Sequence, residues 1–210
     1  MEQINARSIF SPATGFIQRG GFDWTCNPYV GCSMGCSYCY AMFLPQNRRP
    51  REDWGKWFQA KINAVELARK QAPKVAGQAV YLSSVTDPYL PAERSLCLTR
   101  GILEELLPYQ PRLLIQTRGP LVVRDLDVIA RFHSVRVNMS IPTEGRTKDG
   151  RTKGTHLICI LKPDGWRGHH PESGQGLLAV PRGQRQAHRA PASYRQGRCW
   201  RTVFAGFPCG

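Results

Sequence analysis

The sequence lacks any run of eighteen apolar residues, so it does not predict a transmembrane helix. The amino-terminal stretch MEQINARSIFSPATGFIQRG also lacks an apolar core of the signal-peptide type, and secretion is not indicated. Both absences favour a cytoplasmic protein that does not enter a membrane. In that compartment, clustered cysteines are typical of metal sites or catalytic thiols rather than of disulfides.

Acidic residues are scarce as well. Asp and Glu together number 15 against 29 Lys and Arg, which gives a formal net charge of +14. Residues 144–210 alone hold twelve basic and four acidic residues. A basic excess is compatible with nucleic acid as a partner. A basic tail without a packed core produces the same excess, so charge alone does not identify the partner.

Strand and helix patterns alternate from about residue 23 to residue 143. Leu98, Ile102 and Leu106 share one face of a predicted helix. Asn63 is expected to cap an earlier helix, with Glu66 completing a capping box. Such alternation predicts a parallel α/β sheet or barrel, with function at the carboxyl ends of its strands. The expected strands are 57–62, 80–84, 112–117 and 135–141, and the expected helices are 64–71, 96–107 and 121–132.

The apolar periodicity is lost after residue 143. Only 157–161 and 202–207 are predicted strands beyond that point. The basic, Gly/Arg/Pro-rich segment 144–210 is interpreted as a largely irregular tail, either disordered or the product of a shifted reading frame. The predicted organisation is therefore an N-terminal extension over 1–19, an α/β core over 20–143 and this tail.

Four of the eight cysteines lie within fourteen positions, in CNPYVGCSMGCSYC. Cys32, Cys36 and Cys39 form a C-x3-C-x2-C loop, and soft thiolates of this kind select iron–sulfur clusters, zinc or copper(I). A structural zinc site with Cys26 or a histidine as fourth ligand is an alternative, although the second C-x2-C pair common in zinc sites is absent. Inert thiols are a third interpretation. Cys26 is expected to be a strand-end thiol, and Cys97 a core residue of a helix.

The cysteine loop followed by Tyr40 resembles the signature of the radical S-adenosylmethionine (AdoMet) superfamily, known as radical SAM. NPYVGCSMGCSYCYA, SSVTDPYLPAE and LTRGILEEL are similar to its spore-photoproduct-lyase-like (DNA repair photolyase-like) branch, and LVVRDLDVI and NMSIPT continue the resemblance. It covers about residues 20–143 and departs at Met34 and Leu90, where the branch often has histidine and glutamine. Members usually continue into further helix–strand units, so the resemblance implies the N-terminal portion of a partial, incomplete (β/α) barrel.

The resemblance also implies a chemistry. Cys32, Cys36 and Cys39 would hold a 4Fe–4S cluster, and AdoMet would bind its fourth iron. Reductive cleavage of AdoMet would yield a 5′-deoxyadenosyl radical that abstracts hydrogen from an unknown substrate, with a DNA photoproduct as one candidate. The electron would come from a reductant such as flavodoxin or ferredoxin.

Two questions stay open at this point. The chain is either a lyase-like radical AdoMet enzyme or a truncated remnant that has lost activity. The competing function is a zinc-stabilised nucleic-acid-binding protein. Asp87-Pro88 is as typical of a turn as of a ligand contact. The residues that the resemblance places near AdoMet are Tyr40, Ser84, Thr86, Asp87, Thr117, Arg118, Asn138 and Ser140.

Overall fold

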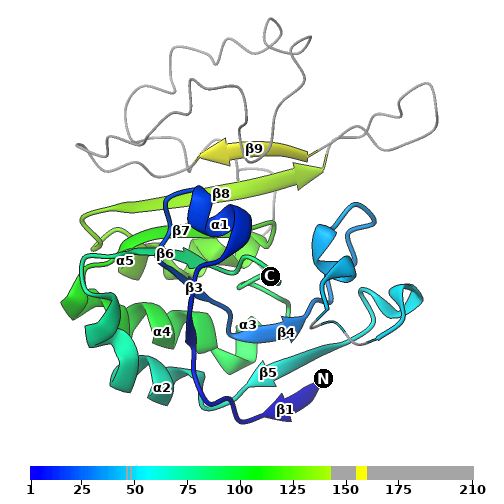
Figure 1. The fold of residues 1–210 in the computed structure, drawn as a ribbon, viewed down its shortest axis with the longest axis horizontal. Coiled ribbons are helices and arrows are strands. Elements are labelled where there is room, and N and C mark those ends of the chain that lie inside the picture. Colours follow the sequence, from blue (N-terminus) through cyan, green and yellow to red (C-terminus); the bar gives the residue numbers. More distant parts are fainter. Residues whose placement is uncertain (46, 48, 143–154, 160–210) are drawn as a thin grey trace, which may run out of the picture. The chain divides into compact units, whose positions relative to one another are not determined.

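The computed structural model of the 210-residue chain describes residues 1–45, 47, 49–142 and 155–159. The predicted strand at 202–207 and most of the predicted tail lie outside these residues. The described residues form a mixed α/β fold with two sheets and several helices (Figure 1). Both sheets are open, and no closed barrel forms in this part of the chain. None of its helices is both long and apolar enough to cross a bilayer.

The larger sheet has six strands in the order β2-β3-β6-β7-β8-β9. Its four central strands, β3, β6, β7 and β8, run parallel. Three of them correspond to expected strands, whereas β3 is not among the expected strands and the strand expected over 57–62 lies in the smaller sheet. β2 and β9 pair antiparallel at the two edges. The strands are β2 (Phe10–Pro12), β3 (Trp24–Cys26), β6 (Ala79–Leu82), β7 (Arg112–Thr117), β8 (Val135–Pro142) and β9 (Thr155–Cys159).

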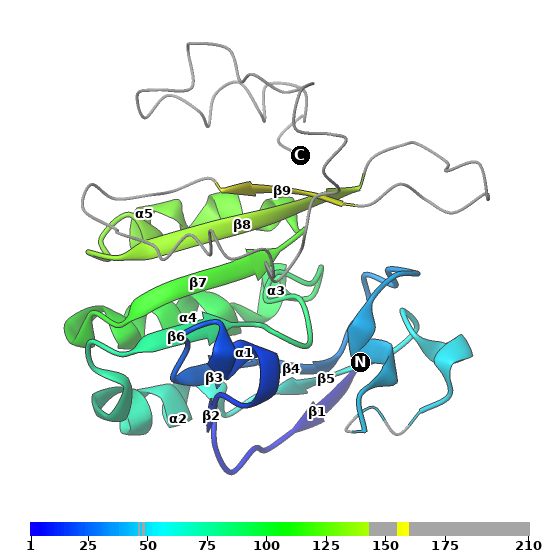
Figure 2. The same cartoon turned by 45° about the horizontal axis from the view of Figure 1, so that its top comes forward.

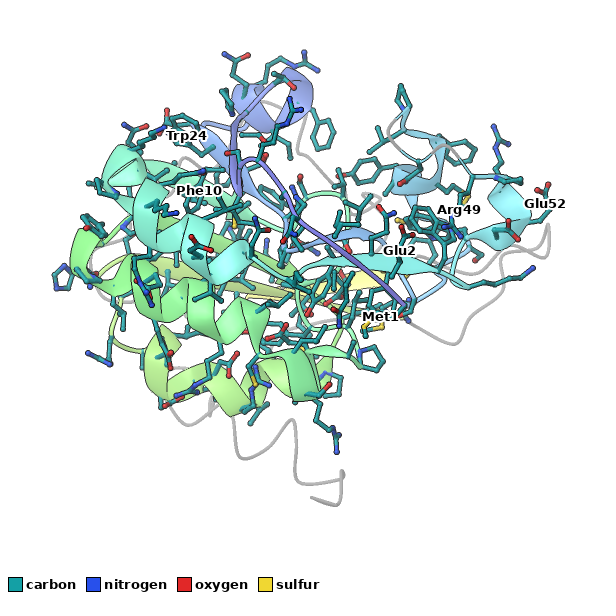
Figure 3. All side chains as sticks on the ribbon, turned by 90° about the horizontal axis from the view of Figure 1, so that it is seen from below. Met1, Glu2, Phe10, Trp24, Arg49 and Glu52 are labelled. Carbon is teal, nitrogen blue, oxygen red and sulfur yellow. The ribbon has the colours of Figure 1, made fainter. Side chains whose placement is uncertain are left out.

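The smaller sheet has three strands in the order β1-β5-β4, with bounds Glu2–Ile4, Phe58–Lys61 and Tyr29–Gly31. The side chains of Glu2 and Arg49 point toward each other in Figure 3, and Arg49 Nη2 lies 3.6 Å from Glu2 Oε2. Residues 1–19, predicted as an N-terminal extension, supply β1 to this sheet and β2 to the larger sheet.

Helices lie on both faces of the larger sheet, and one face carries a fully buried row of side chains. Cys26, Leu82, Ile115 and Val137 are register neighbours across the four parallel strands, and all four are fully buried. Helices cover this face, and the short helix α1 lies on the opposite face (Figure 2). The helices are α1 (Gly15–Arg19), α2 (Ala64–Gln71), α3 (Glu93–Leu96), α4 (Leu98–Leu106) and α5 (Leu126–Ile129).

The prediction for α4 is confirmed, because Ile102, Leu103 and Leu106 are fully buried. Gly101 allows close packing against α2: an added Cβ would lie 2.6 Å from Val65 Cγ2. The helix predicted over 121–132 is only partly α-helical. A 3-10 helix, η5 (Pro120–Asp125), precedes α5, and the fully buried carboxylate of Asp125 at its end pairs with Arg124.

The predicted capping box at α2 is wrong, although the predicted bounds of the helix are correct. The side chain of Asn63 makes no cap hydrogen bond. Its Oδ1 instead accepts from Ala6 N and its Nδ2 donates to Ala6 O, both at 2.9 Å. Glu66 pairs with Lys70 at 2.6 Å. Asn63 therefore holds the chain between β1 and β2 rather than the first turn of the helix.

Candidate functional site

The three cysteines of the C-x3-C-x2-C motif lie in a loop between β4 and the 3-10 helix η1 (Tyr40–Phe43). All three are free thiols; Cys32 is buried, and Cys36 and Cys39 are partly buried. Cys32 packs in an apolar cluster with Tyr29, Ala60, Leu90 and Leu98. We call residues 32–39 the cysteine loop.

Two glycines fix the path of the cysteine loop. Gly31 has a φ of +72°, and a Cβ there would lie 2.6 Å from the ring of Trp57. Gly35, with a φ of +60°, lies so close to Gly55 that a Cβ on Gly55 would be 2.6 Å from Gly35 Cα. Sequence reasoning missed the contacts with Gly55 and Trp57. The only available signal was the glycine between two tryptophans in WGKW.

One motif sulfur has a charged donor. The guanidinium of Arg118 donates to Cys36, with Nη1 2.6 Å from Sγ. Such donors stabilise sulfur ligands, as hydrogen bonds to the sulfurs do in iron–sulfur proteins. Backbone hydrogen bonding by Met34 and Asp87 acts to lower the pKa of Cys32. Backbone hydrogen bonding by Ala41 and Met42 acts in the same direction on the pKa of Cys39.

Burial acts against these donors. It raises the pKa of Cys32 to about 12 and also raises the pKa of Cys39. The neighbouring Cys36 also contributes to raising both pKa values. Among the described residues, no three Cys, His, Asp or Glu side chains are gathered at metal-ligand distances. Ligation by this loop therefore requires the sulfurs to draw closer together.

Asp87 connects the loop after β6 to the end of β7. Its Oδ1 accepts from Tyr89 N at 2.8 Å and from Thr117 Oγ1 at 2.7 Å, and its Oδ2 accepts from Arg118 N at 2.8 Å. Burial raises the pKa of Asp87, while these hydrogen bonds act to lower it. The contact with Tyr89 N is the turn that Asp87-Pro88 predicts. Both carboxylate oxygens already have donors within the chain.

Tyr40, Ser84 and Thr86 also meet at the cysteine loop. The hydroxyl of Tyr40 donates to Ser84 O, and its ring forms an edge contact with Phe16 at 5.4 Å between centroids. Thr86 Oγ1 donates to Gly31 O at 2.6 Å, immediately before Cys32. These contacts attach both ends of the cysteine loop to the segment that follows β6.

Asn138 and Ser140 form a second polar group, on β8. Gln116 Nε2 donates to Ser140 Oγ at 2.7 Å, and Arg136 Nε donates to Asn138 Oδ1 at 2.9 Å. Gln116 and Asn138 are register neighbours on β7 and β8. The expected site residues thus separate into a group around the cysteines and a group further along the sheet.

Ser83, which follows β6 with Ser84, has two features of a functional residue. Its φ is +65°, a conformation that non-glycine residues adopt rarely and mostly where structure demands it. It is 2% exposed, and its hydroxyl has no hydrogen-bond partner among the described residues. A buried hydroxyl without a partner is unfavourable unless a ligand or water supplies one.

The two cysteines outside the motif differ from each other. Cys26 ends β3 and is fully buried, which confirms it as a strand-end thiol, and burial raises its pKa to about 12. The expectation that Cys97 lies in the core is wrong. Cys97 is exposed and has a φ of +50°, because it forms the junction between α3 and α4 rather than a helical position.

Several uncharacterized proteins are similar to this chain. One from Methanocaldococcus jannaschii is 36% identical over 129 residues, which are 61% of this chain and 48% of that protein. One from Acidianus two-tailed virus is 32% identical over 143 residues, covering 61% and 47%. One from Mycobacterium tuberculosis is 36% identical over 115 residues, covering 52% and 33%. The chain spans about half the length, or less, of these curated relatives. No family profile and no solved structure matches it.

Proposed function

We propose that the cysteine loop binds a 4Fe–4S cluster and that the chain is the N-terminal part of a radical AdoMet protein. The larger sheet is then the first portion of an incomplete (β/α) barrel. One observation carries the proposal: Arg118, at the end of β7, donates a hydrogen bond to Cys36 in the loop that holds all three motif cysteines as free thiols. The loops after β6 and β7 also lie at the carboxyl ends of parallel strands, where α/β proteins place their active sites.

The donor set fits the cluster. Three thiolates occupy three irons and leave the fourth iron for an exogenous ligand. When bound and reduced, such a cluster supplies the electron that cleaves AdoMet to a 5′-deoxyadenosyl radical, which then takes hydrogen from a substrate. Cys32, Cys36 and Cys39 are the ligands, and Arg118 places a positive charge beside Cys36.

The other residues orient AdoMet or support the residues that do. Ser83 and Ser84 follow β6, and the hydroxyl of Ser83 is available to hydrogen-bond a polar group of the ligand. Asp87 supports the site, because its oxygens already accept from Tyr89, Thr117 and Arg118. Tyr40 positions the end of the cysteine loop near the adenine.

The substrate side of the proposal depends on segments outside the described residues. Asn138 and Ser140 give the sheet a polar patch that is suited to hydrogen-bonding a nucleoside or a substrate. A nucleic-acid substrate is compatible with the net charge of +14, and flavodoxin or ferredoxin is the proposed electron donor. Because the chain spans about half the length, or less, of these relatives, the proposal for this chain is limited to cluster binding, AdoMet binding and AdoMet cleavage.

Anaerobic reconstitution with iron and sulfide tests the proposal. We expect near-equal iron and sulfide, an EPR signal of the reduced cluster that changes when AdoMet is added, and 5′-deoxyadenosine among the products. Cys36→Ser should lose the cluster signal. Cys97→Ser, which alters an exposed thiol outside the loop, should keep it.

Two outcomes would contradict the proposal. Stoichiometric zinc in place of iron would favour the zinc-stabilised nucleic-acid-binding protein, which a steep salt dependence of DNA affinity would then support. A cluster whose EPR spectrum does not respond to AdoMet would remove the AdoMet chemistry while leaving an iron–sulfur protein.

A further inference from the structure

A group of four charged residues lies outside the cysteine loop, among α3, α4 and η5. We call Glu93, Arg100, Arg124 and Asp125 the ionic cluster. The carboxylates of Glu93 and Asp125 are fully buried. Arg124 pairs with both of them, at 3.2 Å and 2.7 Å, and Arg100 lies 3.4 Å from Asp125. Buried carboxylates of this kind require complete hydrogen bonding to be tolerated.

Glu93 connects three elements through its two carboxylate oxygens. Oε1 accepts from Thr99 N at 2.9 Å and from Arg124 Nη2 at 3.2 Å, so it serves both the first turn of α4 and the 3-10 helix η5. Oε2 accepts from the hydroxyl of Tyr29 in β4. Burial raises the pKa of Glu93, while the hydrogen bonds from Tyr29 and Arg124 lower it.

Tyr29 brings this connection to the cysteine loop. It is fully buried, forms an edge contact with Phe58 at 5.9 Å, and packs in the same apolar cluster as Cys32. Three positions along the chain separate it from Cys32, and Gly31 lies between them. Its hydroxyl is therefore a direct polar link between the strand that leads into the cysteine loop and a carboxylate at the start of α3.

Asp125 has no such link to β4 among the described residues. It neutralises Arg124 and Arg100, and both arginines belong to the helical side of the ionic cluster. The two buried carboxylates thus share Arg124, but only Glu93 also contacts the strand that carries the cysteine loop. Substitutions at Glu93 and at Asp125 can therefore be compared: both should affect the stability of the fold, but only the substitution at Glu93 should affect the position of the cysteine thiols.

We propose that Glu93 is the positioning residue of the cysteine loop, acting through the hydroxyl of Tyr29 to hold Cys32 in place beside Asp87. The inference rests on the proposed function only in taking the loop to be a thiolate site for a soft metal. In this role Glu93 touches neither metal nor substrate. It restricts the loop to arrangements from which the three sulfurs can close on one ion.

Cobalt(II) alone is the probe. Its thiolate charge-transfer absorption reports ligation by the loop without any catalytic readout, and anaerobic titration of the full chain gives the affinity. We expect Tyr29→Phe and Glu93→Gln each to weaken cobalt binding roughly tenfold, as the loss of one hydrogen bond to a charged group would. The double variant should be no weaker than Glu93→Gln, because both changes remove one connection. Asp125→Asn should lower the melting temperature and keep the wild-type affinity.

The outcomes separate the two levels of the proposal. Wild-type affinity in both Tyr29→Phe and Glu93→Gln, or an equal loss in Asp125→Asn, would overturn the positioning role and leave the metal site standing. Tyr29→Phe removes only a hydroxyl, so it decides the question even if Glu93→Gln fails to fold. A wild-type chain that shows no thiolate-to-cobalt absorption would instead overturn the metal site itself, and the positioning role with it.

Discussion

Replacing Gly119 by alanine should destabilise the protein and displace Arg118, the residue immediately before it. An added Cβ would lie 2.9 Å from Tyr89 Cβ and nearer still to Tyr89 O, closer than real Cβ atoms come. Tyr89 is 1% exposed, and its amide is held by Asp87 Oδ1 at 2.8 Å. The obstacle is thus fixed backbone, which cannot move aside as a flexible side chain would.

The cost follows from this overlap alone. Overpacking a filled interior typically costs about 1–3 kcal/mol, and a rigid neighbour favours the middle or the top of that range, so we expect about 2 kcal/mol. The φ of Gly119 is negative, at −76°, so alanine incurs no conformational penalty there. With a urea m-value of about 2 kcal/mol/M, the unfolding midpoint should fall by about 1 M.

Gly101→Ala is the matched control for this prediction. A Cβ at Gly101 would also lie too close to a neighbour, 2.6 Å from Val65 Cγ2, but that neighbour is a side-chain methyl group. Alanine also gains about 1 kcal/mol of helix propensity over glycine, so the net change should stay within about 1 kcal/mol. Urea titrations followed by tryptophan fluorescence compare the two variants. The reasoning would be refuted by a Gly119→Ala protein that unfolds at the wild-type midpoint. It would also be refuted by a Gly101→Ala protein that is less stable than the Gly119→Ala protein.

Three further predictions concern single contacts. Arg118→Gln should lower the reduction potential of a reconstituted cluster by on the order of tens of millivolts, because a positive charge beside Cys36 is lost, and Arg118→Lys should restore part of it in an EPR-monitored redox titration. Asn63→Ala removes both hydrogen bonds to Ala6 and should cost about 1–2 kcal/mol in a urea titration, a smaller loss indicating that water replaces them. Arg100 lowers the pKa of Asp127 to about 2, so the stability advantage over Asp127→Asn should be complete above the ordinary carboxyl pKa of about 4 and should be lost as the pH falls through about 2. An advantage that persists below that pH would contradict this.

The central strands β6, β7 and β8 could be predicted because they are rich in apolar, β-favouring residues, whereas the three-residue strand β3 is not among the expected strands. β7 occupies the predicted range, 112–117, and the buried apolar row through Ile115 needs no knowledge of its neighbours to be recognised. The parallel pairing of these strands could also be predicted, because each pair is connected by a helical segment long enough for the crossover that parallel strands require. Local composition determines these features, and the sequence contains that information directly.

Other features depended on partners that are distant in the chain. Asn63 has the residue type of a helix cap, yet its amide satisfies both backbone groups of Ala6, 57 positions earlier. Cys97 follows an apolar pattern, but a left-handed backbone at the end of α3 turns it to the surface. A residue type that favours a local contact, such as a helix cap, can instead form a more favourable contact with a distant part of the chain. The sequence alone does not show which of the two contacts forms.

Asp87 combines both kinds of information. Its contact with Tyr89 N is local and is the turn that an Asp-Pro pair favours. Its contacts with Thr117 and Arg118 are thirty positions away, and they leave its carboxylate without an open oxygen for a ligand. At the same time, backbone hydrogen bonding by Asp87 acts to lower the pKa of Cys32. The hydrogen bonds of the Asp87 carboxylate attach the loop after β6 to the end of β7. They therefore also hold the backbone amide of Asp87 in place, and Asp87 can serve the cysteine site through its main chain.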